Sequence, residues 1–183
     1  MRKVIASEFV SLDSIFEDPS WTFQFSSEGR DNYKFDELAA SDALLLGRVT
    51  YEGFAAYWPQ QDPEENSFAT QMNGIQKNVV STTLEEPLEW NNSTLIKGNV
   101  AEKVSRLKQQ PGKDILVFGS GDLVNTLMRH DLIDEYRLMV FPVVVGSGKR
   151  LFENWSDQKA LELVDSKTSS TGVLYLTYQP VQN

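Results

Sequence analysis

Two glycines flank a serine at positions 119–121, where a predicted strand, 114–118, passes into a predicted helix, 122–130. Because Gly119 and Gly121 carry no side chains, the backbone there can approach a ligand closely. The first N–H groups of the helix and the positive end of its dipole favour an anion. The stretch is therefore typical of a phosphate-binding turn. Its structural alternative is a tight connection that needs glycine only for steric reasons.

A second stretch with phosphate-binding chemistry follows three leucines, 44–46, which predict a strand buried on both faces. Gly47 allows the chain to turn, and Arg48 and Thr50 stand in the first turn of the next predicted helix. A guanidinium and a hydroxyl in this position suit a pyrophosphate. A third predicted strand ends at Ser81, again with hydroxyl residues. Ligands bind at the carboxyl edge of open α/β sheets, so the three strand ends together favour a dinucleotide site.

The composition predicts a single domain over residues 1–183, with an ordinary hydrophobic content of 40%. The net charge of −9 argues against a nucleic-acid partner or an anionic membrane, since both would repel the chain. The chain has no cysteine and one histidine, which excludes disulfides, Cys/His zinc sites and thiol nucleophiles. We expect this histidine, His130, at a helix end or on the surface.

The first six residues lead directly into a predicted strand, without the apolar stretch of a signal peptide. No run of 18 apolar residues occurs, which argues against a membrane-spanning helix. We therefore expect a cytoplasmic protein.

Strands and helices alternate over the first two thirds of the chain, and only strands follow. The pattern predicts an α/β fold, a central mixed and mostly parallel sheet with flanking helices and with antiparallel strands added at the carboxyl end. The predicted strands are 3–10, 43–47, 77–82, 94–97, 114–118, 135–142, 160–166 and 172–179. The predicted helices are 30–41, 49–56, 67–73, 99–109 and 122–130.

Two groups of aromatic residues leave alternatives open. Trp21, Phe23 and Phe25 alternate, as in an edge strand with one apolar face, although they could also wall a flat heterocycle. Trp58 fits either a lid over a ligand or a plug for the core.

The order of motifs resembles the dihydrofolate-reductase-like superfamily. Within it, the chain resembles stand-alone proteins similar to the reductase domain of the bifunctional riboflavin-biosynthesis deaminase/reductase. The motifs that carry the resemblance, which spans nearly the whole chain, are Ser11-Leu-Asp-Ser14, Leu45-Leu-Gly47-Arg-Val-Thr50-Tyr-Glu, Val79-Val-Ser81-Thr, Phe118-Gly-Ser-Gly121, Leu132-Ile-Asp-Glu135 and Pro142-Val-Val-Val-Gly-Ser-Gly-Lys-Arg-Leu-Phe152.

The resemblance implies an enzyme that binds NADPH across the carboxyl ends of the strands. The positions carried over from the family are Gly47, Arg48, Val49 and Thr50 on one side of the diphosphate, Gly119, Ser120, Gly121, Asp122 and Leu123 on its other side, Ser81 and Thr82 by the adenosine 2′-phosphate with Lys97 as a neighbour, and Leu12, Asp13, Ser14 and Ile15 in a mobile loop over the nicotinamide.

Two features depart from the family pattern. Ser14 stands where relatives usually carry glycine. No arginine follows Ser81, which leaves the preference for NADPH over NADH open, because a 2′-phosphate is best met by a guanidinium. The loop 146–149 receives no role from these arguments.

Hydride transfer to a C=N or C=O bond also needs a proton from a positioned acid or a held water. The family's usual spacing of sixteen residues before Gly47 points to Asp31 as the catalytic carboxylate. Helical geometry places Asp31 on one stripe with Phe35 and Leu38, facing the sheet. The alternative is a first-turn acid favoured by the helix dipole. Asp36 and Glu37 are expected on other faces.

The residues and the resemblance together predict an NADPH-dependent reductase acting on a small pteridine-like or ribosylaminopyrimidine-like substrate, with an unrelated small carbonyl compound also compatible. The resemblance further implies a homodimer. Two other classes stay open, a nucleotide-binding or sensing module without turnover and a structural protein on a reductase fold. Zinc-dependent deamination is excluded by the missing His/Cys cluster.

Overall fold

The computed structural model describes residues 1–153 and 158–181. Its strands are β1 (Val4–Ser11), β2 (Ser41–Gly47), β3 (Gln76–Val80), β4 (Ser93–Ile96), β5 (Asp114–Val117), β6 (Glu135–Phe141), β7 (Leu161–Thr168) and β8 (Leu174–Pro180). Its helices are α1 (Glu28–Ala39), α2 (Arg48–Tyr57), α3 (Ser67–Gly74), α4 (Val100–Gln109) and α5 (Gly121–Arg129), with short 3₁₀ helices η1 (Pro19–Phe25) and η2 (Trp58–Gln60). Every strand and α-helix predicted from the sequence is confirmed, with ends displaced by at most two residues.

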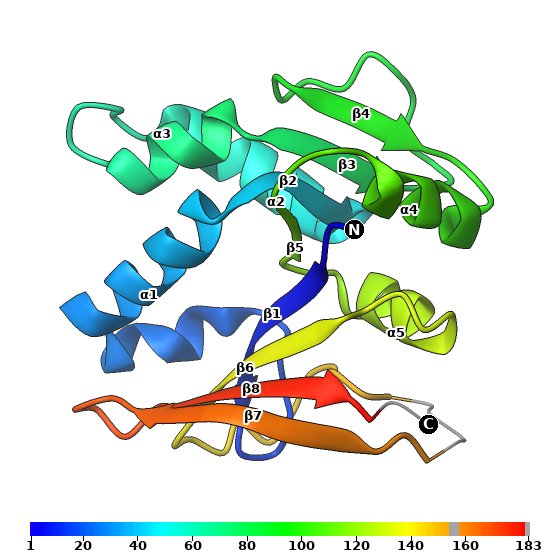
Figure 1. Cartoon of the computed structure of the whole chain (residues 1–183). Helices are drawn as coiled ribbons and strands as arrows, with labels where there is room; N and C mark the ends of the chain where they lie inside the picture. Colours follow the sequence, from blue (N-terminus) through cyan, green and yellow to red (C-terminus); the bar gives the residue numbers. More distant parts are fainter. Residues whose placement is uncertain (154–157, 182–183) are drawn as a thin grey trace.

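The strands form a mixed sheet that crosses the molecule, in the order β4-β3-β2-β5-β1-β6-β8-β7 (Figure 1). From β4 to β6 all neighbouring strands are parallel, so their carboxyl ends meet at one edge. β8 pairs antiparallel with both β6 and β7, as expected for the carboxyl-terminal part. The predicted α/β fold class is therefore confirmed.

Alternating residues of β2 enter two different cores, which is why this strand is apolar along its length. Leu44 and Leu46 pack with residues of α1, α2 and α3. Ala43 and Leu45 pack on the opposite face with residues of α4 and α5. The leucine run is thus buried on both faces, as predicted.

The segment with alternating aromatic residues is the 3₁₀ helix η1, so the edge-strand interpretation of these residues is wrong. Trp21 and Phe25 pack edge-on and tilted against the buried ring of Phe141, at centroid distances of 5.5 and 5.8 Å. Phe23 is exposed. A 3₁₀ helix repeats every three residues, so it does not bring alternate side chains to one face. Trp58 packs against Phe68 in the core below α2 and α3, which favours the core role over a lid.

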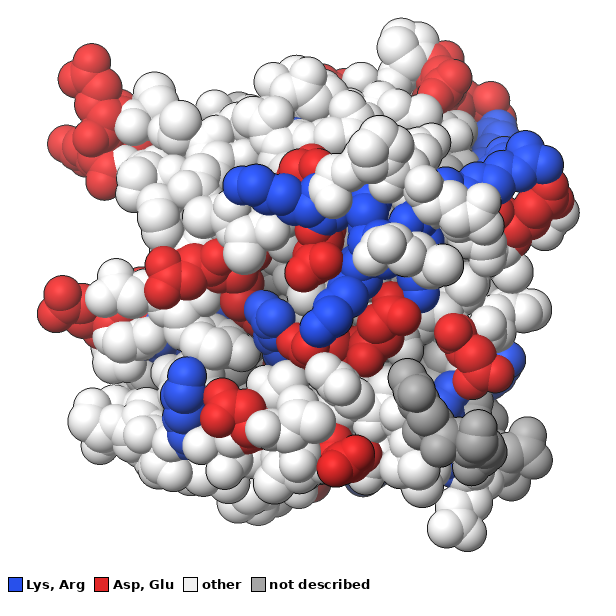
Figure 2. Space-filling model, viewed as in Figure 1, with Lys and Arg blue, Asp and Glu red and all other residues white. Residues whose placement is uncertain are grey.

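Basic and acidic side chains are intermixed on the molecular face shown in Figure 2, where the group of basic side chains near the middle is bordered by acidic ones. His130 ends α5 and is exposed, as expected. Among the described residues, no helix has both the length and the apolar character needed to cross a membrane.

Candidate functional site

The turns after β2 and β5 touch one another at the carboxyl edge of the sheet. The N–H of Gly47 donates to the carbonyl oxygen of Gly119 at 3.0 Å. A Cβ at Gly47 would lie 2.9 Å from the backbone nitrogen of Ser120, and a Cβ at Gly119 would lie 2.7 Å from Oγ1 of Thr50. The contact therefore requires glycine at both positions, so the structure brings the two predicted phosphate-binding stretches together.

Two helices begin at this contact without side-chain caps. The N-cap of α2 is Gly47 and that of α5 is Ser120, and neither makes a side-chain cap hydrogen bond. The first N–H groups of a helix have no acceptor within the helix, and the dipole adds positive potential. Two uncapped N-termini side by side therefore favour one extended anion such as a diphosphate.

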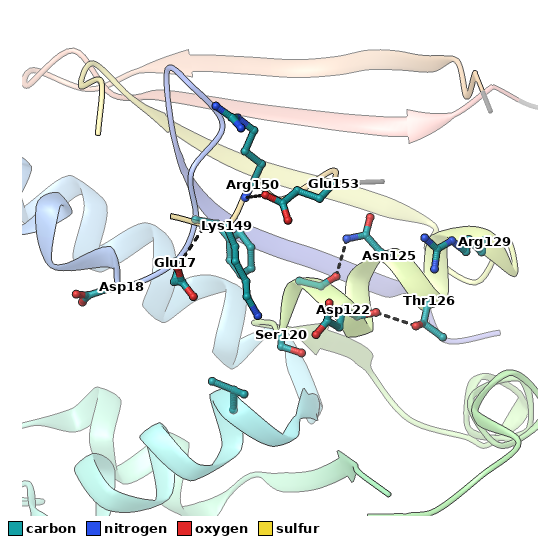
Figure 3. Close-up of a pocket in the computed structure, with 13 residues that line it drawn as sticks. Glu17, Asp18, Ser120, Asp122, Asn125, Thr126, Arg129, Lys149, Arg150 and Glu153 are labelled. Atoms are coloured by element: carbon teal, nitrogen blue, oxygen red, sulfur yellow. Dashed lines mark hydrogen bonds between the residues drawn. The ribbon is translucent and has the colours of Figure 1, made fainter. Parts of the chain in front are cut away.

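A pocket of about 420 Å³ opens beside these helix starts (Figure 3). Four of the expected cofactor residues line it, namely Val49, Ser120, Gly121 and Asp122. The side chain of Leu123 is instead buried in the core, so only its backbone can serve a ligand. Lys149, which the sequence did not single out, extends into the pocket on the side of Ser120 (Figure 3).

Two glycine variants test the close packing of these turns. Gly47→Ala should lower the free energy of unfolding by about 1–3 kcal/mol, because the new methyl group forces the turns apart. Gly53, inside α2, has no atom within 4 Å of a built Cβ. Gly53→Ala should raise the free energy of unfolding by about 0.5–1 kcal/mol through helix propensity. Urea unfolding measures both, and similar effects at the two positions would contradict the packing argument.

The expected covering loop, which contains Leu12, Asp13, Ser14 and Ile15, is held by the loop 143–151. The carboxylate of Asp13 accepts hydrogen bonds from the N–H groups of Val145 at 3.0 Å and Gly146 at 2.8 Å. The bond from Ser11 Oγ, together with these two, lowers the pKa of Asp13 to about 2. Asp13 thus anchors its loop to the segment that the sequence left without a role.

Two backbone hydrogen bonds also hold the covering loop against the loop 143–151. The N–H of Leu151 donates to the carbonyl oxygen of Ser14 at 3.0 Å, and that of Phe16 donates to Lys149 at 3.1 Å. Ser14 has a φ of 66°, in the left-handed region that favours glycine. This backbone conformation accounts for the glycine that the resemblance leads us to expect at position 14.

The ring of Phe16 lies against the turn before α5. A Cβ at Gly121 would lie 2.8 Å from Cε1 of Phe16, and the ring also lines the pocket. Gly121 therefore makes room for this ring as well as for any ligand. Sequence reasoning missed Phe16 because an apolar residue in a loop carries no chemical signal.

The expected cofactor residues Ser81, Thr82 and Lys97 follow the two outer strands, β3 and β4. β3 and β4 are the next strands beyond β2, so Ser81 and Lys97 follow at the same edge. Ser81 Oγ accepts from the N–H groups of Thr83 and Leu84, while Thr82 is exposed. Lys97 pairs with Glu85 at 2.6 Å on the surface.

The predicted orientation of Asp31 is wrong. Its side chain is 67% exposed and pairs with the neighbouring Arg30 at 3.2 Å. Helix α1 is rotated relative to the predicted stripe, so that it buries Glu37 and Leu38 while Asp31 and Asp36 face solvent. Asp31 therefore fits the alternative reading, a first-turn acid at the start of α1.

Glu37, which was expected on another face, is the acid that α1 buries. Its carboxylate accepts hydrogen bonds from Lys34 Nζ at 2.7 Å and from Ser7 Oγ at 2.8 Å. Arg137 of β6 also reaches it, at 3.4 Å. Lys34 Nζ lies 4.2 Å from the ring centroid of Phe118, at the end of β5. A satisfied polar cluster therefore joins α1 to the sheet.

Glu8 is a second buried acid that sequence reasoning missed. It exposes 6% of its surface, and its Oε1 has no hydrogen-bond partner among the described residues. Burial raises the pKa of Glu8 to about 8, with Lys34 opposing the shift and Glu37 adding to it. The available signal was a glutamate in the middle of the predicted strand 3–10.

A mixed, mostly parallel sheet with flanking helices, and with glycine turns and paired helix starts at its carboxyl edge, defines an α/β fold of the dihydrofolate-reductase type. The RibD C-terminal domain family matches residues 2–175, and the chain belongs to this family. The uncharacterized protein YyaP of Bacillus subtilis (strain 168) is 30% identical over 178 residues, covering 97% of this chain and 94% of YyaP. The family points to a reductase-type oxidoreductase.

Two solved structures share the fold. A protein from Shewanella sp. PV-4, named for riboflavin biosynthesis, superposes with a TM-score of 0.79 at 21% identity and full coverage of both chains. Dihydrofolate reductase from Enterococcus faecalis, complexed with NADP(H), gives a TM-score of 0.64 at 14% identity, covering 98% of this chain and 97% of that enzyme.

Proposed function

We propose that the protein is an NADPH-dependent reductase that transfers hydride to a small heterocycle of the pteridine or ribosylaminopyrimidine class. The observation that carries the proposal is the contact between the uncapped starts of α2 and α5, beside an open pocket. Family membership supports the reaction type. A cytoplasmic homodimer completes the proposal, and analytical ultracentrifugation tests the homodimer.

The residues present fit a dinucleotide. The free N–H groups at the starts of α2 and α5 would bind the diphosphate. Arg48 would add a charged contact, because its surface pair with Glu52, at 2.8 Å, leaves both side chains nearly half exposed and costs little to break. When bound, NADPH supplies the hydride, while the chain binds and orients the cofactor and the substrate and excludes water from them.

Preference for a 2′-phosphate would depend on the ends of β3 and β4. Lys97 is 41% exposed, and its partner Glu85 is 81% exposed, so the lysine can turn to a phosphate near Ser81. A compact ammonium is a weaker phosphate ligand than a guanidinium. We therefore propose a modest preference for NADPH over NADH.

Titration calorimetry with NADPH tests the cofactor site directly. Arg48→Ala should weaken binding by about 1.5–3 kcal/mol, because a charge-assisted hydrogen bond is lost. Lys167→Ala is the matched control, because this substitution also removes one positive charge. Lys167 is exposed on β7, at the other end of the sheet. Binding that is absent in the parent, or equal in Arg48→Ala, would contradict the proposed site.

Turnover separates a reductase from a sensing module. NADPH oxidation with dihydrofolate and with 5-amino-6-ribosylaminouracil phosphate, followed by the loss of nicotinamide absorbance, probes the two proposed substrate classes. A sensing module would bind NADPH without oxidising it with either probe.

A further inference from the structure

Glu8 lies where β1 continues beyond its neighbour β5. The two strands pair only as far as Ala6 and Val117, whereas β1 stays paired with β6 as far as Ser11. Beyond Val117 the chain turns away through Gly119. A Cβ at Gly119 would lie 3.9 Å from Oε1 of Glu8 and 2.7 Å from Oγ1 of Thr50. The carboxyl group of Glu8 therefore lies beside the contact between the turns at Gly47 and Gly119, which belongs to the proposed cofactor site.

The charges around Glu8 do not supply it with a counter-ion. Lys34 and Glu37, both on α1, are the charged groups that act on it, and they are already paired with each other at 2.7 Å. The position opposite Glu8 on β6 is the apolar Leu138, and Gly119 and Thr50 are uncharged. An ionised carboxylate without a partner is costly in such surroundings. The neutral acid, which can donate a proton, is favoured instead.

A buried acid with an unpartnered oxygen is unusual unless something else meets that oxygen. The cluster of Ser7, Lys34, Glu37 and Arg137 is internally satisfied, so it does not require Glu8. Asp31, the acid expected from the sequence, faces solvent. Among the described acids, Glu8 thus combines burial, a free oxygen and a position beside the cofactor turns.

We propose that Glu8 Oε1 supplies the proton that accompanies hydride transfer, an inference that rests on the proposed reductase function. The carbon of the substrate C=N or C=O bond receives the hydride from the cofactor. The O–H bond of Glu8 breaks, and its proton forms the new N–H or O–H bond on the neighbouring substrate atom. The carboxylate then regains a proton from water before the next turnover.

Infrared difference spectroscopy tests the acid without relying on turnover. The parent minus Glu8→Gln spectrum should contain a protonated-carboxyl band that is lost as the pH is raised through 8. Addition of NADPH should shift this band, because the acid lies beside the bound cofactor. Asp31→Asn, which removes an exposed carboxyl group, should leave the band unchanged. Absence of the band, or a band that NADPH does not shift, would overturn the proposal.

Kinetics with the same two probe substrates give the second arm. Glu8→Gln should bind NADPH like the parent but lower kcat by about 10²–10⁴-fold. In the parent, kcat should fall as the pH rises through 8, as the acid ionises. Glu8→Asp keeps an acid, one methylene shorter, and should retain more activity than Glu8→Gln. If Glu8→Gln does not fold, the comparison of Glu8→Asp with the parent still tests the proposal.

The two arms separate this inference from the reductase proposal. A parent protein that does not bind NADPH in calorimetry would refute the cofactor site itself. Normal NADPH binding with equal kcat in the parent and Glu8→Gln would refute only the role of Glu8. If the protein oxidises NADPH with neither probe substrate, the infrared experiment tests the role of Glu8 by itself.

Discussion

Glu37→Ala should lower the free energy of unfolding by about 3–5 kcal/mol, one of the largest losses expected from a single substitution in this protein. The carboxylate is 2% exposed and receives hydrogen bonds from Lys34, Ser7 and Arg137. Its removal leaves the Lys34 ammonium, itself 13% exposed, without its anion. A buried charge without a partner is far more costly than the pair was stabilising.

Asp36→Ala is the matched control, because it removes a carboxylate one position earlier on α1, where the side chain is exposed. Its effect should stay within about 0.5 kcal/mol. Urea unfolding at neutral pH compares the two variants. A loss of less than about 1 kcal/mol for Glu37→Ala would show that water reaches the cluster in solution, since solvent screening weakens such pairs.

Glu8→Gln should remove a pH dependence from the stability of the protein. The pKa of Glu8 is raised from 4.5 to about 8, so the native chain holds a proton there that the unfolded chain releases. The stabilisation is fully present below pH 4.5 and is lost as the pH rises through 8. Between these values the parent should lose about 2–4 kcal/mol relative to Glu8→Gln.

Denaturant unfolding of both proteins across this pH range measures the difference directly. Contributions from the other titrating groups cancel because both proteins contain them. Asp31→Asn should track the parent at every pH, since it replaces an exposed carboxylate. Parallel stability curves for the parent and Glu8→Gln would mean that Glu8 ionises normally.

The sequence predicted every α-helix and strand among the described residues, and its failure at residues 21–25 is informative. The apolar run at 44–46 and the glycine turns at Gly47 and Gly119 are local patterns with one stable solution, a doubly buried strand that turns into a helix. The alternation of Trp21, Phe23 and Phe25, by contrast, does not specify whether the segment forms a strand or a 3₁₀ helix. Packing against Phe141 selected the 3₁₀ helix, and no local pattern encodes that contact.

Sequence reasoning likewise found only part of the candidate site. The two glycine turns of the candidate site consist of backbone whose conformation is specified within a few residues, so their positions could be predicted. The role of the loop 143–151 could not, because it depends on hydrogen bonds to Asp13, about 130 positions away in the chain.

What the sequence by itself determined is which strand ends carry the candidate phosphate-binding groups, those of β2, β3 and β5, and a net charge of −9 that argues against nucleic acid. Only the tertiary structure decided which acids are buried. A rotation of α1 exposes Asp31 and buries Glu37, and the early end of β5 leaves Glu8 beside the turn at Gly119. Burial of a charged group depends on what packs against it from distant segments, and that packing sets its protonation state.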